Sequence, residues 1–389
     1  MSPRSPRTRR HFLEQIATTA ATVAATPWLA NATQQPPPQK PSPRDKTPFP
    51  YVDGLSFLGP PGDIAASGLS ALICDVSTAE RLKTDDGSIK YFRSFEACAR
   101  SMTSMRRQLN GGQIPGVFLA TKGSEIREAY RSGRTAVFFQ FQGCEPIGED
   151  LTRLDLFYEL GLRVLQITHH NNNMWGGGAI EKTWTGLTKV GTEGVERLNA
   201  LGIIPDLSHV SDVTSLDVLR VSKRPVILSH GAARALVNNA RCASDEVIKG
   251  VAKSGGAVGV FMMSFWLTTD ATPTPDSYIK QIRHVANIGG IDAVGIANDY
   301  PIGGEQAAIK VGNDNAQAIK GYLPWWESVR AQGVLGFDAQ PSHVVIPELN
   351  NPRRAFAIHE ALDRGGFKTA EIEKIMGANW TRVLTDCLG

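Results

Sequence analysis

Cysteine is scarce in this chain and follows no metal-binding or redox spacing. The 389 residues include five cysteines, and no two of them form a C-x-x-C pair. Zinc ribbons and dithiol redox motifs are therefore excluded. The five positions are Cys74, Cys98, Cys144, Cys242 and Cys387. In an oxidising compartment one or two disulfides can form among them, and the odd number leaves at least one thiol free.

The chain also lacks a strong charge of one sign and a dinucleotide-binding fingerprint. Its net charge is +3, and no long basic run follows residue 10, so nucleic-acid binding is not indicated. No G-x-G-x-x-G follows the first predicted strand, which disfavours an open doubly wound sheet. What remains is an ordinary globular composition, 42% hydrophobic and 20% charged.

The N-terminal 50 residues are predicted to lie outside the folded domain. Residues 1–32 contain the twin-arginine pattern TRRHFL, a weakly apolar Ala/Thr-rich segment and the A-x-A cleavage site ANA. We interpret them as a twin-arginine signal peptide, too short and too rich in threonine to span a membrane, which predicts a periplasmic protein. Residues 33–50 are proline-rich and predict an extended linker. Residues 51–389 then form one large domain.

From residue 69 onward, apolar runs alternate with amphipathic stretches. Strands are predicted at 69–76, 115–120, 135–141, 163–168, 203–206, 225–229, 257–262 and 293–296. Helices are predicted between them at 94–109, 125–132, 151–160, 191–201, 213–221, 245–254 and 276–287. Eight strands alternating with helices predict the α/β class and a (β/α)₈ TIM barrel. Helical patterns at 319–331 and 353–375 predict extra C-terminal helices.

Several predicted strands end in a residue that can carry chemistry. The polar residues at these ends are Gln142, His169, His209, His230 and Asp299. In a TIM barrel the C-terminal ends of the strands form the reaction face, so these side chains should converge. His209 and His230 end successive strands, which is how a parallel barrel presents metal ligands. His170 should point away from its neighbour His169 and receives no role.

On these residues the chain resembles the membrane (renal-type) dipeptidases, peptidase family M19 of the amidohydrolase superfamily. The segments that carry the resemblance are GLRVLQITH (161–169), LGIIPDLSHVSD (201–212), KRPVILSHGAAR (223–234), NNARCASD (238–245), GIANDY (295–300) and MGANWTRVL (376–384). The resemblance implies a (β/α)₈ barrel that carries two zinc ions and hydrolyses dipeptides. It also makes a homodimer one expected assembly, because family members often dimerise.

The resemblance assigns a role to each matching residue. His209 and His230 correspond to the histidines of the second zinc. Asp299 corresponds to a late aspartate that is both a ligand and a proton acceptor. His169 corresponds to a histidine that faces the substrate, and Arg241 to the arginine that binds the substrate carboxylate.

Three family zinc ligands are replaced in this chain. Where the family has Asp-Gly-His-x-Asp, residues 53–57 read DGLSF, so Leu55 and Phe57 stand at the two ligand positions of the first zinc. Where the family has a glutamate that bridges both ions, this chain has Gln142. A neutral amide is a much poorer bridge between two dications than a carboxylate. A two-zinc centre of the family type is therefore not expected.

One divalent cation, with zinc the expected ion, can still be held by His209 and His230. Asp299, Gln142 or Cys144 is the candidate third ligand, and a water molecule is the fourth. Such an open site lowers the pKa of the bound water to about 7. The chain is thus predicted to be an exported dipeptidase-like metallohydrolase that cleaves an amide bond in a small, dipeptide-like substrate bearing a carboxylate.

Other interpretations remain open at this point. The protein can be a metal-free pseudoenzyme that binds a peptide or small metabolite, or a periplasmic tailoring enzyme that acts on a peptide-derived metabolite without metal. His209 and His230 can be core histidines bonded to nearby backbone. If His209 binds a metal ion, Asp206 is a candidate to orient its ring. Arg241 can be a surface arginine paired with Asp245.

Overall fold

The computed structural model describes residues 46–389 except residues 79 and 84–88. The predicted signal peptide and most of the predicted linker lie outside the described residues. No helix in the described part of the chain is both long enough and apolar enough to cross a membrane. All five cysteines are buried and carry free thiols, so none of the disulfides left open by the sequence is formed.

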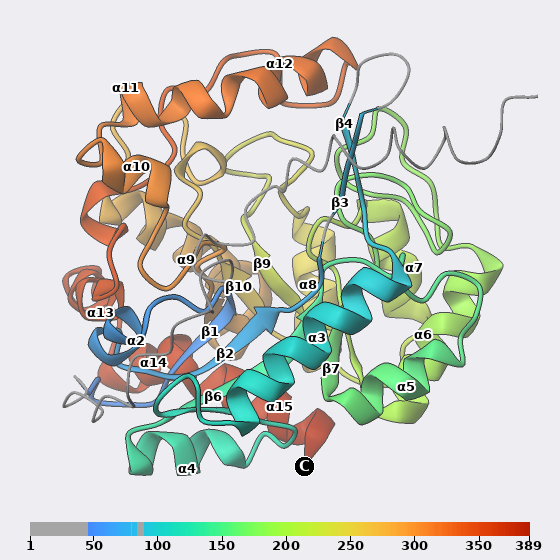
Figure 1. Ribbon diagram of the computed structural model, residues 1–389. Helices are drawn as coiled ribbons and strands as arrows, with labels where there is room; N and C mark the ends of the chain where they lie inside the picture. Colours follow the sequence, from blue (N-terminus) through green and yellow to red (C-terminus); the bar gives the residue numbers. More distant parts are fainter. Residues whose placement is uncertain (1–45, 79, 84–88) are drawn as a thin grey trace, which may run out of the picture.

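Eight parallel strands form a nearly closed barrel, which confirms the predicted (β/α)₈ fold (Figure 1). Their order around the barrel is β8-β7-β6-β2-β1-β11-β10-β9. The bounds are β1 Tyr51–Ser56, β2 Leu69–Asp75, β6 Thr135–Phe141, β7 Leu162–Gln166, β8 Ile204–Asp206, β9 Leu228–Gly231, β10 Val258–Val260 and β11 Val294–Ile296. The barrel closes between β8 and β9, where the Leu207 amide donates to the Ile227 carbonyl (2.8 Å) and the Ile227 amide to the Pro205 carbonyl (3.0 Å).

Amphipathic helices cover the outside of the barrel, close to the predicted positions (Figure 1). They are α3 Phe95–Asn110, α4 Glu125–Ser132, α5 Arg153–Leu160, α6 Lys189–Leu201, α7 Asp212–Val221, α8 Asp245–Lys253 and α9 Pro275–Gly289. A Ser or Thr hydroxyl accepts from a backbone amide of the first turn in α3, α6, α7 and α8. These caps satisfy donors that the helix itself leaves unpaired and fix where each helix begins.

Further short helices precede β2 and follow the last strand. They are α2 Pro61–Ala66, α10 Gln306–Lys310, α11 Asn315–Ala318, α12 Leu323–Ala331, α13 Arg354–Arg364, α14 Thr369–Glu373 and α15 Asn379–Leu388, with a π-turn at Lys374–Ala378. The predicted helix at 353–375 is therefore two helices. The chain breaks at Gly365 and Gly366, the second of which has a φ of +79°, a backbone conformation that favours glycine.

One predicted barrel strand lies outside the barrel, and one barrel strand was not predicted. The run at 115–120 forms β5 (Val117–Leu119), which pairs with β6 alone, off the path of the eight barrel strands. The eighth place is taken by β1, between β2 and β11. Its sequence, YVDGLS, contains an aspartate and a glycine that both disfavour strands, so tertiary pairing rather than local propensity determines this strand. A separate antiparallel hairpin joins β3 (Glu80–Lys83) and β4 (Ile89–Phe92).

Helix α15 crosses the N-terminal ends of the barrel strands and fills the barrel from that side. Trp380 is fully buried, and its indole Nε1 donates to the Ile296 carbonyl at 3.0 Å. A Cβ on Gly54 or Gly295 would come within 2.5 Å of the indole ring, so only glycine fits opposite it. Burying a side chain of this size contributes about 4 to 6 kcal/mol from apolar area. The N-terminal end is thus closed by packing, and only the C-terminal end remains for a site.

Candidate active site

His209, His230 and Asp299 converge at the C-terminal end of the barrel. They follow β8, lie within β9 and follow β11, so three strands deliver them to one place. The two Nε2 atoms of the histidines are 2.8 Å apart, and Asp299 Oδ1 is 3.7 Å from His230 Nε2. The three candidate ligand atoms all lie within 4.8 Å of one another. His209 and His230 are the pair that the sequence placed around one cation, and Asp299 is one of the three residues that it offered as the third ligand.

A chain of hydrogen bonds behind His230 determines how its ring is oriented. Its Nδ1 lies 2.8 Å from Ser229 Oγ, which donates to Asp206 at 2.6 Å. The carboxylate of Asp206 is fully buried and also accepts from Ser208 and Gln140. Since the Ser229 proton points at Asp206, Nδ1–H of His230 donates to Ser229. The lone pair of Nε2 then faces His209 and is available to a metal ion.

Asp206 therefore supports His230, whereas the sequence suggested that it orients His209. Burial raises the pKa of the Asp206 carboxyl, and the hydrogen bonds from Ser229 and Ser208 oppose that rise. The carboxylate also joins the two strands at the barrel closure, because it accepts from the backbone amides of Ser208 (3.0 Å) and Ser229 (2.9 Å). One buried side chain thus closes the barrel and aligns a candidate ligand.

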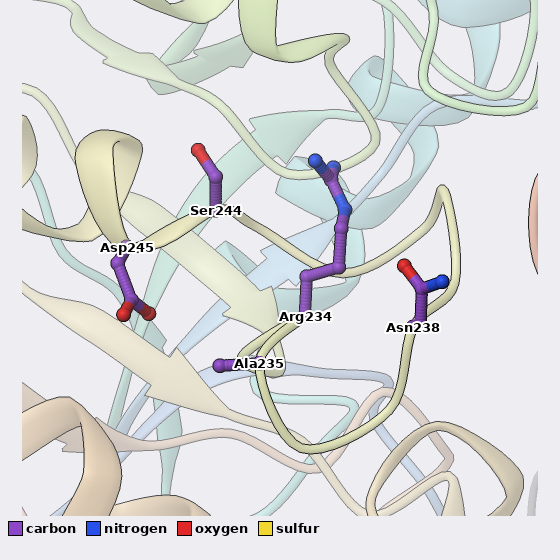
Figure 2. Close-up of a pocket in the computed structure, with 5 residues that line it drawn as sticks. All are labelled: Arg234, Ala235, Asn238, Ser244 and Asp245. Carbon is purple, nitrogen blue, oxygen red and sulfur yellow. The ribbon is translucent and has the colours of Figure 1, made fainter.

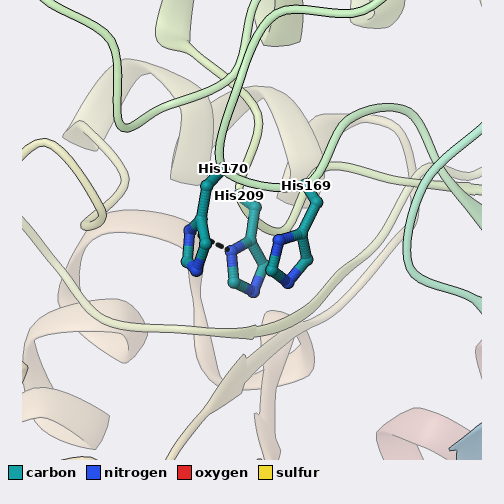
Figure 3. Close-up of side chains that lie close together, drawn as sticks. All are labelled: His169, His170 and His209. Carbon is teal, nitrogen blue, oxygen red and sulfur yellow. Dashed lines mark hydrogen bonds between the residues drawn. The ribbon is translucent and has the colours of Figure 1, made fainter. Parts of the chain in front are cut away.

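His170 supports the other candidate ligand, a role that sequence reasoning missed. Its Nδ1 lies 3.2 Å from Nδ1 of His209, so a proton on His209 Nδ1 can be shared with it while His209 Nε2 stays free for a cation. The ring of His169 stacks on His209 at 4.4 Å between centroids, and the three imidazoles lie side by side (Figure 3). The pair of adjacent histidines at 169–170 was the only sequence signal for this cluster.

The electrostatics keep the imidazoles neutral. Burial, reinforced by the positive charge of Arg241, lowers the pKa of His209 and His230 well below the usual value. The same two effects lower the pKa of His170 to about 3. Burial, followed by the neighbouring His170, lowers the pKa of His169 well below its usual value. Neutral imidazole is the form that binds a metal ion, so the cluster is ready to do so at pH 7.

Asp299 has the properties of a proton acceptor near neutral pH. Burial raises the pKa of its carboxyl from 3.8 to about 7, although the charge of Arg241 opposes the rise. Its backbone has a φ of +63°, and that of His209 a φ of +64°. Left-handed backbone is uncommon for residues other than glycine, although aspartate and histidine adopt it more readily than most, and it is concentrated at functional sites. Two of the three candidate ligands have this conformation.

Arg241 is a buried member of the site and not a surface residue. It is 3% exposed, and its guanidinium lies over the rings of Phe261 and Trp266, at 5.0 and 5.4 Å from their centroids. Its Nη2 atom is 2.9 Å from His209 Nε2. Asp245, the alternative partner considered from the sequence, lies 2.7 Å from His284 instead.

The replaced family ligands surround this cluster without adding a metal donor. Leu55 is fully buried, and its backbone carbonyl accepts from the Asp299 amide at 2.8 Å, so its position now holds the aspartate in place. Phe57 is partly exposed. Gln142 is 4% exposed, and its Nε2 has no hydrogen-bond partner in the described part of the chain. Two groups of potential ligands occur in the described residues, His169–His170–His209 and His209–His230–Asp299, and Cys144 belongs to neither. Burial raises the pKa of its thiol well above the usual value.

The donor set fits one divalent cation. Zinc accepts two imidazole nitrogens and a carboxylate oxygen at about 2.0 to 2.2 Å, so bound donors are at most about 4.2 Å apart. The His209–His230 separation of 2.8 Å and the His230–Asp299 separation of 3.7 Å are already below this limit, and all three donors lie within 4.8 Å of one another. Both histidines already have an outer hydrogen-bond partner, as metal ligands usually do. The Nη2 atom of Arg241 points at the same lone pair of His209 and must move aside when a cation binds.

A separate surface hollow of about 400 Å³ is lined by Arg234, Ala235, Asn238, Ser244 and Asp245 (Figure 2). The guanidinium of its arginine is already bonded to neighbouring residues. Arg234 forms two bonds to Asp212, at 2.6 and 3.0 Å, and also donates to the carbonyls of Cys242 and Asn239. This hollow therefore offers no free charged group, and the chemistry belongs to the histidine cluster.

Comparison with known families and curated proteins agrees with this geometry. The sequence model described as membrane dipeptidase (peptidase family M19) matches residues 84–317. Dipeptidase tcpJ of Claviceps purpurea is 29% identical over 274 residues, 69% of this chain and 55% of that protein. Dipeptidase verJ of Clonostachys rogersoniana is 33% identical over 186 residues, 47% of each chain. The matches thus span about half the length of these relatives.

Solved structures share the barrel over nearly its whole length. An amidohydrolase from Pseudomonas aeruginosa is 27% identical with a TM-score of 0.70, covering 88% of this chain and 97% of that one. A metallo peptidase from Rhodobacter sphaeroides, liganded with a phosphinate mimic of the dipeptide L-Ala-D-Ala, has a TM-score of 0.69 over 87% of this chain and 99% of its own. Its identity is 18%, so that likeness concerns the fold alone.

Proposed function

Because the chain belongs to the membrane dipeptidase family, peptidase family M19, we propose that it hydrolyses an amide bond in a small, dipeptide-like substrate that bears a carboxylate, using one divalent cation. Zinc is the ion we expect. The observation that supports this proposal is the convergence of His209 Nε2, His230 Nε2 and Asp299, each histidine with a hydrogen-bond partner behind it.

The residues around the cluster have the chemistry that this reaction needs. A divalent cation held there supplies a Lewis acid that lowers the pKa of a water molecule to about 7. Asp299, whose carboxylate lies beside His230, accepts the water proton as the oxygen bonds to the carbonyl carbon. The same carboxylic acid then returns the proton to the amine nitrogen when the C–N bond breaks.

His169 and Arg241 position the substrate in this proposal. His169 remains neutral, so it can donate a hydrogen bond to the substrate carbonyl without carrying charge into the site. Arg241 turns from His209 toward the substrate carboxylate and binds it through two parallel hydrogen bonds. Its stacking on Phe261 and Trp266 limits this motion to a small swing.

The proposed stoichiometry is one ion and not two. Leu55 and Phe57 offer no lone pair, and an amide at Gln142 does not bridge two dications. His209, His230 and Asp299 suit a single cation with an open position for water, and the other group of potential ligands in the described residues, His169, His170 and His209, shares His209 with it.

One observation favours a second candidate, a metal-free protein that binds a carboxylate-bearing ligand. Arg241 Nη2 donates to His209 Nε2 at 2.9 Å, which places a permanent positive charge beside the lone pair that a cation needs. If this arrangement persists in solution, the guanidinium takes the place of the ion. The cluster is then a binding site without a Lewis acid.

Metal content and turnover, measured together, separate the two candidates. The protein is purified without chelator, its metal content per chain is determined, and hydrolysis of L-Ala-D-Ala and a panel of other dipeptides is followed with and without chelator. About one zinc per chain with chelator-sensitive turnover supports the metallohydrolase. No metal and no turnover overturns it in favour of the binding protein, and turnover that survives chelator indicates metal-free chemistry such as a tailoring reaction.

A buried histidine outside the cluster provides the control for the ligand assignment. His343 is 4% exposed and hydrogen bonds to Ser264 Oγ at 2.8 Å. We expect His209→Gln and His230→Gln to abolish zinc binding, whereas His343→Gln leaves it unchanged. Equal metal content in all three variants would remove the histidines from the proposed ligand set.

We also propose that the protein is exported to the periplasm by the twin-arginine route. The proposal rests on Arg9 and Arg10 followed by an apolar segment and an A-x-A site. Replacing both arginines with lysine should retain the unprocessed protein in the cytoplasm, as seen by cell fractionation. Normal export of that variant would refute this route.

A further inference from the structure

Besides Arg241 Nε in the histidine cluster, two buried hydrogen-bond donors near the end of β2 have no acceptor in the described residues. They are Nη1 of Arg93 and Nε2 of Gln142, and their side chains belong to residues that are 4% exposed each. A buried donor without an acceptor is costly, and most such groups in folded proteins are paired. Both atoms are donors only, so the missing partner is an oxygen that accepts hydrogen bonds.

The two donors are held against the same short segment at the end of β2. Arg93 Nε donates to Ser77 Oγ at 2.8 Å, and the Ser77 amide donates to Asp75 Oδ1 at 2.8 Å. The backbone amide of Gln142 donates to that same Asp75 oxygen at 3.3 Å. Ser77 therefore holds the Arg93 side chain and Asp75 holds the Gln142 backbone beside the same segment, and the Asp75 carboxylate balances the charge of Arg93.

That region lies at the C-terminal end of the barrel. Gln142 is the first residue after β6, in which Gln140 reaches Asp206 within the barrel and Phe141 packs on Phe157 of α5, and its side chain is buried there. Asp75 ends β2, the strand that pairs with β1 on one side and β6 on the other. The donors thus lie on the side of the mouth where Leu55 and Phe57 offer no ligands.

We propose that Arg93 and Gln142 form an oxyanion subsite that binds the carbonyl oxygen of the scissile amide. This inference rests on the proposed hydrolase function. In it, Arg93 and Gln142 do the work that a second metal ion would do, which is to stabilise the negative charge on the carbonyl oxygen. When water oxygen bonds to the carbonyl carbon, the π electrons of the C=O bond move to the oxygen and the water proton goes to Asp299. The carbonyl oxygen, now negatively charged, receives the two N–H donors. When the C–N bond breaks, the electrons return to C=O and the nitrogen leaves with the proton.

The charge and rigidity of the subsite match this role. A guanidinium held by Ser77 and a buried side-chain amide lie ready for negative charge as it develops, and in a site with little water such donors stabilise it strongly. A neutral glutamine is also better suited than a glutamate here, because a carboxylate would repel the oxyanion. Replacement of the family glutamate by Gln142 thus removes a negative charge and adds an N–H donor at the same position.

The test compares a transition-state mimic with a substrate. Arg93→Met and Gln142→Met remove one donor each with little change in volume, and Arg93→Lys restores the charge. A phosphinate analogue of a dipeptide is the probe, because its tetrahedral oxygens resemble the oxyanion, and its affinity is measured by calorimetry alongside kcat and KM. Arg131→Met, on the exposed face of α4, is the control.

We expect each methionine variant to lose about 10²-fold or more in kcat, by analogy with the loss of one oxyanion donor, with KM changed much less. Phosphinate affinity should fall in parallel, with partial recovery in Arg93→Lys and no change in Arg131→Met. Circular dichroism and thermal melts establish that each variant is folded. If Arg93→Met is unstable, Gln142→Met carries the test, because it leaves the bonds among Arg93, Ser77 and Asp75 in place.

Other results would overturn the subsite. Unchanged phosphinate affinity in folded Gln142→Met refutes it, as does a rise in KM with kcat unchanged that appears only for substrates with a second carboxylate. The latter result would assign Arg93 to substrate docking. Failure of the proposed function can be told apart from failure of the subsite. If the wild-type protein has no metal and no turnover but binds the phosphinate, and both methionine variants bind it more weakly, the subsite stands and only the hydrolase function is refuted.

Discussion

The hydrogen-bond chain behind His230 yields the sharpest test of the candidate metal site. Ser229 Oγ lies 2.8 Å from His230 Nδ1 and 2.6 Å from Asp206 Oδ2, so Ser229→Ala cuts the chain at its middle while leaving both ends in place. The His230 ring then has no acceptor for its Nδ1 proton and loses the constraint on its tautomer. Zinc binding should weaken because the lone pair at Nε2 is no longer fixed toward His209.

The expected size of the effect follows from the hydrogen bonds that Ser229→Ala removes. Loss of an outer hydrogen-bond partner of a metal ligand typically costs 10- to 100-fold in metal affinity, which is about 1.4 to about 2.8 kcal/mol. Leaving the His230 donor unpaired in a fully buried place should also lower the free energy of unfolding by about 1 to 3 kcal/mol. Ser208 Oγ, which is 3.0 Å from Ser229 Oγ, keeps its own bond to Asp206 in this variant.

A matched pair of variants makes this prediction decisive. Ser264 is also fully buried, and its Oγ lies 2.8 Å from Nδ1 of His343, away from the cluster. Ser264→Ala should therefore cost similar stability and leave zinc affinity unchanged. Zinc dissociation constants are measured by competition with a chromophoric chelator, and stability by urea denaturation. An equal loss of zinc affinity in both variants, or in neither, would refute the role given to Ser229.

Three further predictions follow from other residues of the site and core. Gln142→Glu should raise the zinc content of the purified protein, because it returns a carboxylate to the cluster; unchanged metal content would count against a cation beside His209 and His230. Arg241→Lys should raise KM about 10- to 100-fold with a smaller change in kcat, because lysine cannot form the bidentate pair, and steady-state kinetics would show the split. Burial raises the pKa of Asp53 from 3.8 to about 7, so its contribution to stability is complete below pH 4 and is lost as pH rises to 7. The free energy of unfolding is measured by urea denaturation at pH 5, 6 and 7, and in the wild type we expect it to fall as pH rises. Asp53→Asn should make this fall less steep by up to about 1.4 kcal/mol per pH unit. The same pH dependence in both proteins would exclude the Asp53 carboxyl as its source.

The strand that completes the barrel, β1 instead of β5, is a part of the fold that the sequence did not predict. The apolar run at 115–120 has the composition of a barrel strand but forms β5, which pairs only with β6. The YVDGLS segment has a poor strand composition but occupies the eighth barrel position, because Asp53 accepts from the Leu55 and Asn298 amides and Gly54 makes room for Trp380. Asn298 and Trp380 are both far from this segment in sequence, so no local pattern could predict the exchange.

His170, Arg93 and Asp206 illustrate the same limit within the site. Adjacent residues of an extended chain point to opposite sides, which is why His170 was expected to face away from His169. The chain turns after β7, and both rings reach His209. Arg93 lies in no recognisable motif, and its place beside Asp75 depends on how the β3–β4 hairpin returns to the barrel.

The sequence by itself determined the alternation of strands and helices, the strand ends that carry histidine and aspartate, and the family to which the chain belongs. These features depend on hydrophobic periodicity and short motifs, which are local properties of a chain. Only the tertiary structure decided which strand completes the barrel, which partners orient the two histidines, and which donors are left without an acceptor. Those outcomes depend on interactions between residues far apart in sequence, made when closure of the barrel buries their polar groups together.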